Sequence, residues 1–291
     1  MASIYEKQSD PIIIQSLFAQ CRYYTYAKIW TGVYFVICIA LVCVFAILKG
    51  QCKSGFITGL SIGLSVATFF AASSINEIVY SLKKKAAEIQ QYIDTSIFKR
   101  EEDEPDIWQS PLTTNKIKEI VSSFPKSGFC KNDKWYEDYS SQPYNKQIIL
   151  CQKENIRWDK DLRKCYKYLC IVLLIAAVIT IFVVGLLRNS PMLETLCFIS
   201  WTLPFIKYCY SFKKRMNEDE ERLEKLNHTA DNLAELDCEN HSDVFHLIVG
   251  LQNDIFEHRK KTVLIPNKFY RILYKFFQKR EENIAGNYRG E

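Results

Sequence analysis

Residues 168–187 read YLCIVLLIAAVITIFVVGLL, a run of 20 residues without a charged side chain. Three other long apolar runs cover residues 30–48, 55–76 and 192–212. A helix needs about 20 apolar residues to cross a hydrocarbon layer about 30 Å thick, because it rises about 1.5 Å per residue. The runs therefore predict an all-α integral membrane protein with four transmembrane helices, arranged as two hairpins, and a cytoplasmic helical bundle.

The run at 192–212 is the least regular, because it contains Glu194, Pro204 and Lys207. We expect Glu194 to stay hydrated at one end and Lys207 to reach the headgroups at the other. A proline is tolerated in a packed bundle of membrane helices. The run is still predicted to span the membrane.

Charge is concentrated outside the runs. The 291 residues contain 38 Lys+Arg and 33 Asp+Glu, and the two short loops at 49–54 and 188–191 hold three of the basic residues. This pattern excludes an ordinary soluble domain, a disordered chain and a disulfide framework. Because basic segments stay inside, both termini are predicted to be cytoplasmic in a cell membrane. The 11 cysteines include no CxxC pair, and those outside the spans are expected to be reduced.

The topology divides the chain into five segments. They are an N-terminal cytoplasmic helix at 1–29, a hairpin at 30–80, a cytoplasmic helical region at 81–167, a hairpin at 168–212 and a C-terminal cytoplasmic helical region at 213–291. The hairpins exit through YSLKK at 80–84 and YSFKK at 210–214, which indicates either an internal repeat or two chance basic flanks. Residues 147–167 are predicted to continue as one helix into the third run. Residues 268–279 are predicted to pack on the bundle, or else to lie on the inner leaflet.

The second run carries two stripes at helical spacing. Small residues on one side favour close helix packing, and hydroxyl and amide side chains on the other line a pore or bond their own backbone. The candidate packing positions are Gly59, Gly63, Ala67 and Ala71, and the candidate pore-lining positions are Thr58, Ser61, Ser65, Thr68 and Asn76.

The segment before the third run carries a basic stripe opposite an apolar face, in which Asn155 is a candidate helix-packing residue. The stripe is either a solvated face next to the membrane, which topology alone explains, or a phosphate site with aromatic rings to stack a base. The candidate ligand-binding residues are Trp135, Tyr136, Lys153, Arg157, Trp158, Lys160 and Lys164.

No motif for catalysis is visible. The sequence has no glycine-rich phosphate loop, no HExxH, no GxSxG and no Cys/His ligand pattern. We therefore expect no enzyme, no cofactor and no metal site. An enzyme that acts on lipid headgroups through scattered carboxylates is the least favoured alternative.

Residues 13–30 (IIQSLFAQCRYYTYAKIW) and 148–166 (IILCQKENIRWDKDLRKCY), each leading into a run, resemble the SMODS-associating four-TM effectors. The resemblance implies a membrane-permeabilising effector of bacterial anti-phage signalling (CBASS). In such a system a cGAS-like nucleotidyltransferase makes a cyclic oligonucleotide, which the effector binds in its cytoplasmic region before permeabilising the inner membrane. It brings no catalytic residues.

The leading hypothesis is a homo-oligomeric, ligand-gated pore of the bacterial inner membrane. Its partners would be the lipid bilayer and the cyclic oligonucleotide, with no DNA or RNA. The alternative is a membrane-anchored helical scaffold or sensor that recruits partners without forming a pore.

Overall fold

The computed structural model describes residues 3–51, 55–100, 107–124, 135–187, 192–236 and 242–289, with only the backbone for most helical positions between 39 and 72 and between 177 and 209. Every described element is a helix, which confirms the all-α prediction. The helices are α1 (Ile4–Lys7), α2 (Pro11–Gln51), α3 (Gly55–Phe98), α4 (Thr114–Ser122), α5 (Tyr144–Leu187), α6 (Met192–Glu235), α7 (Ser242–Lys261) and α8 (Asn267–Arg289).

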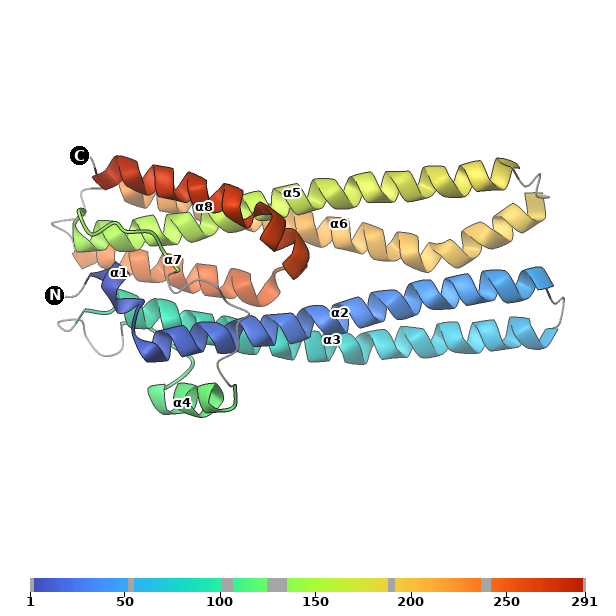
Figure 1. The fold of residues 1–291 in the computed structure, drawn as a ribbon, viewed down its shortest axis with the longest axis horizontal. Helices are drawn as coiled ribbons and strands as arrows, with labels where there is room; N and C mark the ends of the chain where they lie inside the picture. The colour runs from blue at the N-terminus through green and yellow to red at the C-terminus, as the bar shows by residue number, and fades with distance from the viewer. Residues whose placement is uncertain are drawn as a thin grey trace.

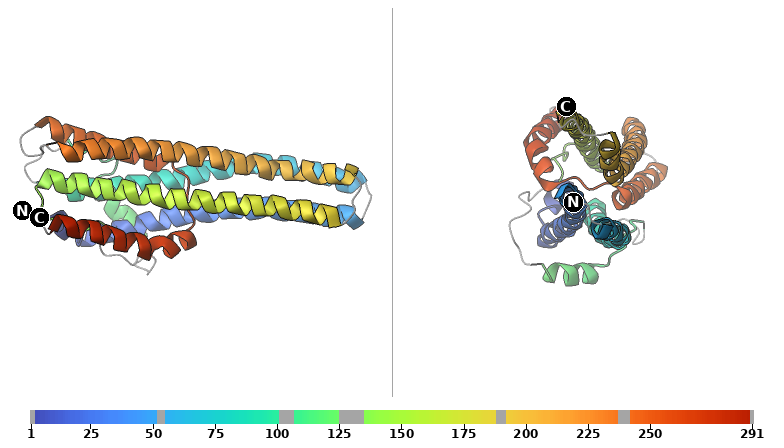
Figure 2. Two further views of the ribbon diagram at one scale, coloured as in Figure 1. Left: turned by 90° about the horizontal axis from the view of Figure 1, so that it is seen from above. Right: turned by 90° about the vertical axis from the view of Figure 1, so that its right-hand side faces the viewer.

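Two long hairpins, α2/α3 and α5/α6, run side by side along the molecule (Figure 1). Each of these helices has 41 or 44 residues, which corresponds to roughly 60 Å or more at 1.5 Å per residue. The shorter helices α7 and α8 cover only the half that holds both termini (Figures 1 and 2). In the view from above, α8 lies on the opposite side of α5 from α6 (Figure 2).

The half covered by α7 and α8 has a continuous apolar core. Ile89, Ile93 and Phe98 of α3 pack there with Ile149 of α5 and Leu223 of α6, all nearly or fully buried. Phe98 also contacts the rings of Trp108 and Tyr136, with centroids 5.9 and 5.7 Å apart. This half of the bundle is therefore held together by ordinary burial of apolar side chains.

Beyond this core the same helices expose large apolar side chains. On α5, Val172 is 61% exposed and Ile179 is 57% exposed, and Val36 of α2 is 63% exposed. Each long helix also has an exposed aromatic residue: Trp30 in α2, Tyr80 in α3, Tyr168 in α5 and Tyr210 in α6.

Within the described part of the chain, none of the helices has a stretch long and apolar enough to cross a membrane. The predicted spans at 30–48, 55–76, 168–187 and 192–212 fall largely on positions whose side chains lie outside the described residues.

Two predictions about individual helices are confirmed. The helix predicted to run from residue 147 into the third run is α5, unbroken from Tyr144 to Leu187. The C-terminal stretch packs on the bundle, since Phe277, Glu281 and Ala285 of α8 are buried. One expectation is wrong: Cys21 in α2 is disulfide-bonded rather than reduced.

Replacing Phe98 with alanine tests the core. We expect Phe98→Ala to lower the free energy of unfolding by about 3–5 kcal/mol, because it removes a fully buried ring and leaves a cavity. Thermal unfolding in detergent, followed by circular dichroism, measures the loss. Ile272→Ala, at a position 75% exposed, is the control and should change stability by less than about 0.5 kcal/mol. Equal effects of the two variants would contradict the assigned core.

Candidate functional site

A buried charge lies in the middle of the covered half of the bundle. Asp94 of α3 is fully buried and forms an ion pair with Arg259 of α7, with Oδ2 and Nη1 2.5 Å apart. Tyr136 donates to its other oxygen at 2.9 Å, and Gln252 of α7 donates at 2.9 Å. A buried carboxylate needs such partners because water cannot reach it. The pair therefore fastens α7 to α3.

A second buried carboxylate, Asp219 of α6, lies next to the segment that joins α7 to α8. Its Oδ2 accepts from the Arg163 guanidinium of α5 at 2.8 Å, from the Thr262 hydroxyl at 3.1 Å and from the Val263 amide at 2.7 Å. Its Oδ1 is paired with Arg222. Asp219 thus holds α5 and the segment 262–266 against α6.

All four long helices contact the segment 262–267, which we call the α7–α8 connection. Lys83 of α3 donates to the Thr262 carbonyl at 2.6 Å, and Arg163 of α5 donates to the Val263 carbonyl at 2.8 Å. On α2, Lys28 donates to Asn267 Oδ1 at 2.6 Å. With Asp219 from α6, each long helix sends one charged side chain to this short segment. The α7–α8 connection is therefore the place where the two hairpins are tied together.

Asp159 and Arg163 of α5 are both held in their charged forms next to the α7–α8 connection. Burial raises the pKa of Asp159, but the Arg163 guanidinium and His258 outweigh it and hold that pKa well below its usual range. Arg163 Nε donates to Asp159 at 2.9 Å, and His258 Nε2 lies 3.1 Å from the same oxygen. Arg163 therefore bridges Asp159 and Asp219 as a permanent cation.

The basic stripe of α5 is occupied by carboxylates from neighbouring helices. Lys153 pairs with Asp231 at 2.5 Å, Lys160 pairs with Glu224, and Lys167 pairs with Glu220 at 2.6 Å, all from α6. The three lysines are seven residues apart, so they lie along one face of α5. Arg157 is paired with the fully buried Glu281 of α8.

A family model described as the SMODS-associating 4TM effector domain matches residues 2–287. The chain belongs to the SMODS-associating 4TM effector family. No curated protein and no solved structure matches.

The predicted aromatic residues of this effector lie inside the fold. Tyr136 is buried and donates to Asp94, while Asn155 of α5 donates to the Tyr136 hydroxyl at 3.4 Å. Trp135 is half-buried against the main core. Trp158 packs among the rings of Tyr270, Tyr274 and Phe277 of α8, at centroid distances of 6.2, 5.7 and 5.6 Å. Of the predicted basic residues, only Lys164 is fully exposed.

The side chains predicted to line a pore or to pack in the second span of this effector mostly lie outside the described residues. This applies to Thr58, Ser61, Ser65, Thr68, Gly59 and Gly63. Ala67, Ala71 and Asn76 are described, and all three are exposed in the single chain.

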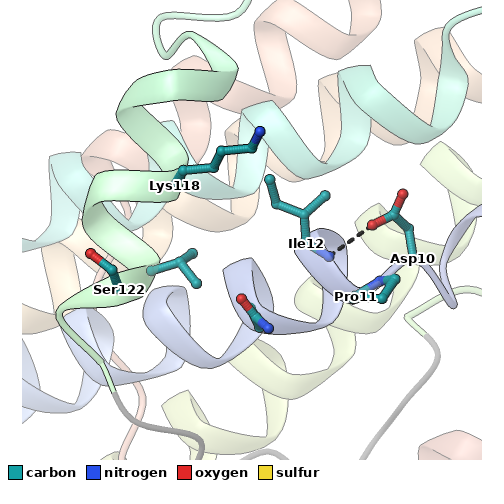
Figure 3. A pocket seen from close by; sticks show the side chains of 7 residues that line it. Asp10, Pro11, Ile12, Lys118 and Ser122 are labelled. Carbon is teal, nitrogen blue, oxygen red and sulfur yellow. Dashed lines mark hydrogen bonds between the residues drawn. The ribbon is translucent and has the colours of Figure 1, made fainter.

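A shallow pocket lies between the start of α2 and α4, with Lys118 and Ser122 on one side and Asp10, Pro11 and Ile12 on the other (Figure 3). Asp10 already caps α2, accepting from the Ile12 amide at 2.7 Å. The pocket therefore offers an anion no free helix start. Among the described residues, no group of His, Cys, Asp or Glu is placed to hold a metal ion.

The buried acids and their partners were not predicted from the sequence. Asp219 and Arg259 have charged or polar neighbours in sequence, so their burial gave no local signal. The one usable hint was Asp94, which lies between Ile93 and Ile97 on a predicted apolar face.

Removing the Asp219 charge tests the tie between the hairpins. We expect Asp219→Asn to lower the free energy of unfolding by about 3–5 kcal/mol, because buried Arg163 loses a partner. It should also speed hydrogen exchange at the Val263 amide, which donates to Asp219. Mass spectrometry of exchanged peptides measures this. Asp231→Asn, in a half-exposed pair with Lys153, is the control and should cost about 1 kcal/mol or less. Unchanged exchange at Val263 in Asp219→Asn would contradict the assignment.

The buried Glu154 of α5 gives a pH prediction. Burial raises its pKa from 4.5 to about 8, so the folded chain keeps a proton that the unfolded chain releases. Stability should therefore fall as pH rises from about 4.5 to 8, by up to about 1.4 kcal/mol per pH unit from this group. Melting temperatures at pH 6 and pH 8 should converge in Glu154→Gln, but not in Glu119→Gln, at an exposed site on α4. A wild-type slope retained in Glu154→Gln would contradict the prediction.

Proposed function

We propose that this effector is a homo-oligomeric pore former of the bacterial inner membrane, gated by a cyclic oligonucleotide that binds its cytoplasmic bundle. The observation that carries the proposal is the match of the SMODS-associating 4TM effector model to residues 2–287. In an anti-phage response, the nucleotide from a cGAS-like nucleotidyltransferase triggers permeabilisation, which ends the infection by killing the cell.

The distribution of exposed apolar side chains supports the placement in a membrane. Val36, Val172 and Ile179 are exposed beyond the half that α7 and α8 cover. The long helices have 41 or 44 residues, whereas α7 and α8 have 20 and 23, so much of each long helix extends past them. Each of the four long helices carries an exposed Trp or Tyr side chain, and such residues favour membrane interfaces. The four proposed spans are those at 30–48, 55–76, 168–187 and 192–212.

The ion pairs along α5 suggest how an anionic ligand acts. Lys153 and Lys160 are bound to Asp231 and Glu224, whose side chains are 40% and 64% exposed. Such half-exposed pairs contribute little to stability and exchange partners readily. The phosphates of a cyclic oligonucleotide replace these carboxylates and are also bound by Lys164, which is exposed four residues after Lys160 on α5. Arg157, Trp135, Tyr136 and Trp158 contact other parts of the bundle, so they support this face from within. Binding then releases α6 from α5 within the cytoplasmic bundle.

This release shifts the spans because α5 and α6 continue without a break from the ion pairs into the apolar half. A ligand that moves the population from 1:99 to 99:1 has to favour the open state by about 5.5 kcal/mol. The hydroxyl stripe of α3 (Thr58, Ser61, Ser65, Thr68, Asn76) lines the open pore, and the small residues opposite it pack against a neighbouring helix.

Liposomes loaded with a self-quenching dye test the proposal. The full-length protein should release dye when the cognate cyclic oligonucleotide is added, and not without it. Impermeability across a broad panel of cyclic di- and trinucleotides would contradict a nucleotide-gated pore.

Charge variants of the ion pairs separate ligand binding from a structural role. Lys153→Gln with Lys160→Gln should raise the nucleotide concentration for half-maximal release at least tenfold, because the phosphates lose their partners. Asp231→Asn with Glu224→Gln breaks the same pairs but frees the lysines, and should lower that concentration. If both double variants change the response in the same direction, the stripe is structural and the ligand binds elsewhere.

A second candidate is a membrane-anchored scaffold that recruits a partner. It is favoured by the exposure of Ile272 and Phe276 on α8, at 75% and 68%. Ser61→Asp and Ser65→Asp distinguish the two, since a pore changes its conductance whereas a scaffold does not conduct in either form.

A further inference from the structure

Two half-buried lysines lie at the α7–α8 connection with neutral acceptors. Lys28 Nζ donates to the side-chain oxygen of Asn267, and Lys83 Nζ donates to the main-chain oxygen of Thr262, both at 2.6 Å. Within the described residues neither ammonium is within ion-pair distance of a carboxylate. The pKa of each is lowered to about 8, mainly by burial; Arg163 adds to this at both lysines, and Asp219 partly opposes it at Lys83.

The charges around the α7–α8 connection do not balance. In the hydrogen-bonded network the cations are Lys28, Lys83, Arg163 and Arg222 and the carboxylates are Asp159 and Asp219, so at least two positive charges are in excess. Arg215 near Lys83 adds to the positive charge, and His258 adds to it when protonated. Both carboxylates already accept from arginines. A net positive, partly desolvated cluster attracts an anion, and an anion with several oxygens satisfies two ammonium groups at once.

The depth of the cluster points to the source of the anion. Lys28 lies two residues before Trp30, and Lys83 lies three residues after Tyr80, so both are within about 5 Å of the aromatic level along their helices. Aromatic residues at membrane interfaces mark the headgroup level. Basic side chains between helices on the cytoplasmic side bind anionic headgroups.

We infer that Lys28 and Lys83 form a phosphate site at the α7–α8 connection, which takes the headgroup of an anionic inner-leaflet phospholipid. The site joins α2 and α3 of the first hairpin at the segment to which α5 and α6 of the second hairpin also bind. The bound headgroup therefore stabilises the closed arrangement, in which the two hairpins are held together at the α7–α8 connection. The inference rests on the membrane placement proposed above, but not on the formation of a pore.

Native mass spectrometry tests the site. The full-length protein is reconstituted in nanodiscs of phosphatidylcholine and phosphatidylglycerol in equal amounts and released in mild detergent. We expect wild type to retain phosphatidylglycerol in preference to phosphatidylcholine. Retention should fall about fivefold for each of Lys28→Gln and Lys83→Gln, because a basic residue near an anionic surface contributes about 1 kcal/mol. Lys28→Arg with Lys83→Arg should retain it, which shows that charge rather than loss of folding is responsible.

Lys116→Gln with Lys118→Gln, on exposed α4, is the matched control and should retain the lipid as wild type does. Equal retention in the Lys28→Gln/Lys83→Gln variant, or equal loss in the control, would overturn the site. A second arm uses cyclic di-adenosine monophosphate in nanodiscs of phosphatidylcholine alone. Binding of that probe that depends on Lys28 and Lys83, without retention of phosphatidylglycerol, would overturn the headgroup assignment. Flotation with phosphatidylcholine vesicles reports insertion separately, so failure of the membrane placement is distinguishable from failure of the site.

Discussion

The arrangement of the chain depends on the need to give each buried charge a partner. Asp94 and Asp219 are nearly inaccessible to water, and each gathers donors from segments far apart in sequence. Because a buried carboxylate is costly without such donors, α7 can pack in essentially one register against α3, α5 and α6. That register places the α7–α8 connection between the hairpins, where it contacts all four long helices.

The surroundings of the side chains on the four long helices change along the length of these helices. In the covered half, a continuous set of apolar side chains is buried and the buried carboxylates Asp94 and Asp219 have several donors each, as in a soluble bundle. Beyond Trp30, Tyr80 and Tyr168, the described large apolar side chains of α2, α3 and α5 include exposed ones such as Val36, Ile78 and Val172. The four long helices are continuous across this boundary. In the proposed function this continuity couples ligand binding to the membrane.

Much of the fold followed from the sequence because its signals are long and regular. Uninterrupted runs gave the two hairpins of long helices, and the absence of a helix breaker from 147 to 187 gave α5 as one helix. The apolar spacing of residues 268–279 favoured packing on the bundle but left the inner leaflet open, and the buried Phe277 of α8 bears out the packing.

The candidate site was less accessible to sequence reasoning. The basic stripe of α5 was visible, but not its carboxylate partners, since Asp231, Glu224 and Glu281 lie more than 60 residues away in sequence. Ion pairing between helices depends on tertiary register, which local periodicity does not contain. For the same reason the charge excess at Lys28 and Lys83 emerged only once four helices were placed around one short segment.

In the proposed function α5 passes from the charged bundle into lipid at Tyr168 without a break. Spin labels at single cysteines replacing Lys160, Lys164, Val172 and Ile179, in the full-length protein in nanodiscs, test this through their accessibility to oxygen and to a water-soluble nickel complex. We expect the nickel complex to reach the label at 164, and oxygen to dominate at 172 and 179. Equal access of the nickel complex to 164, 172 and 179 would show that α5 does not enter lipid at Tyr168.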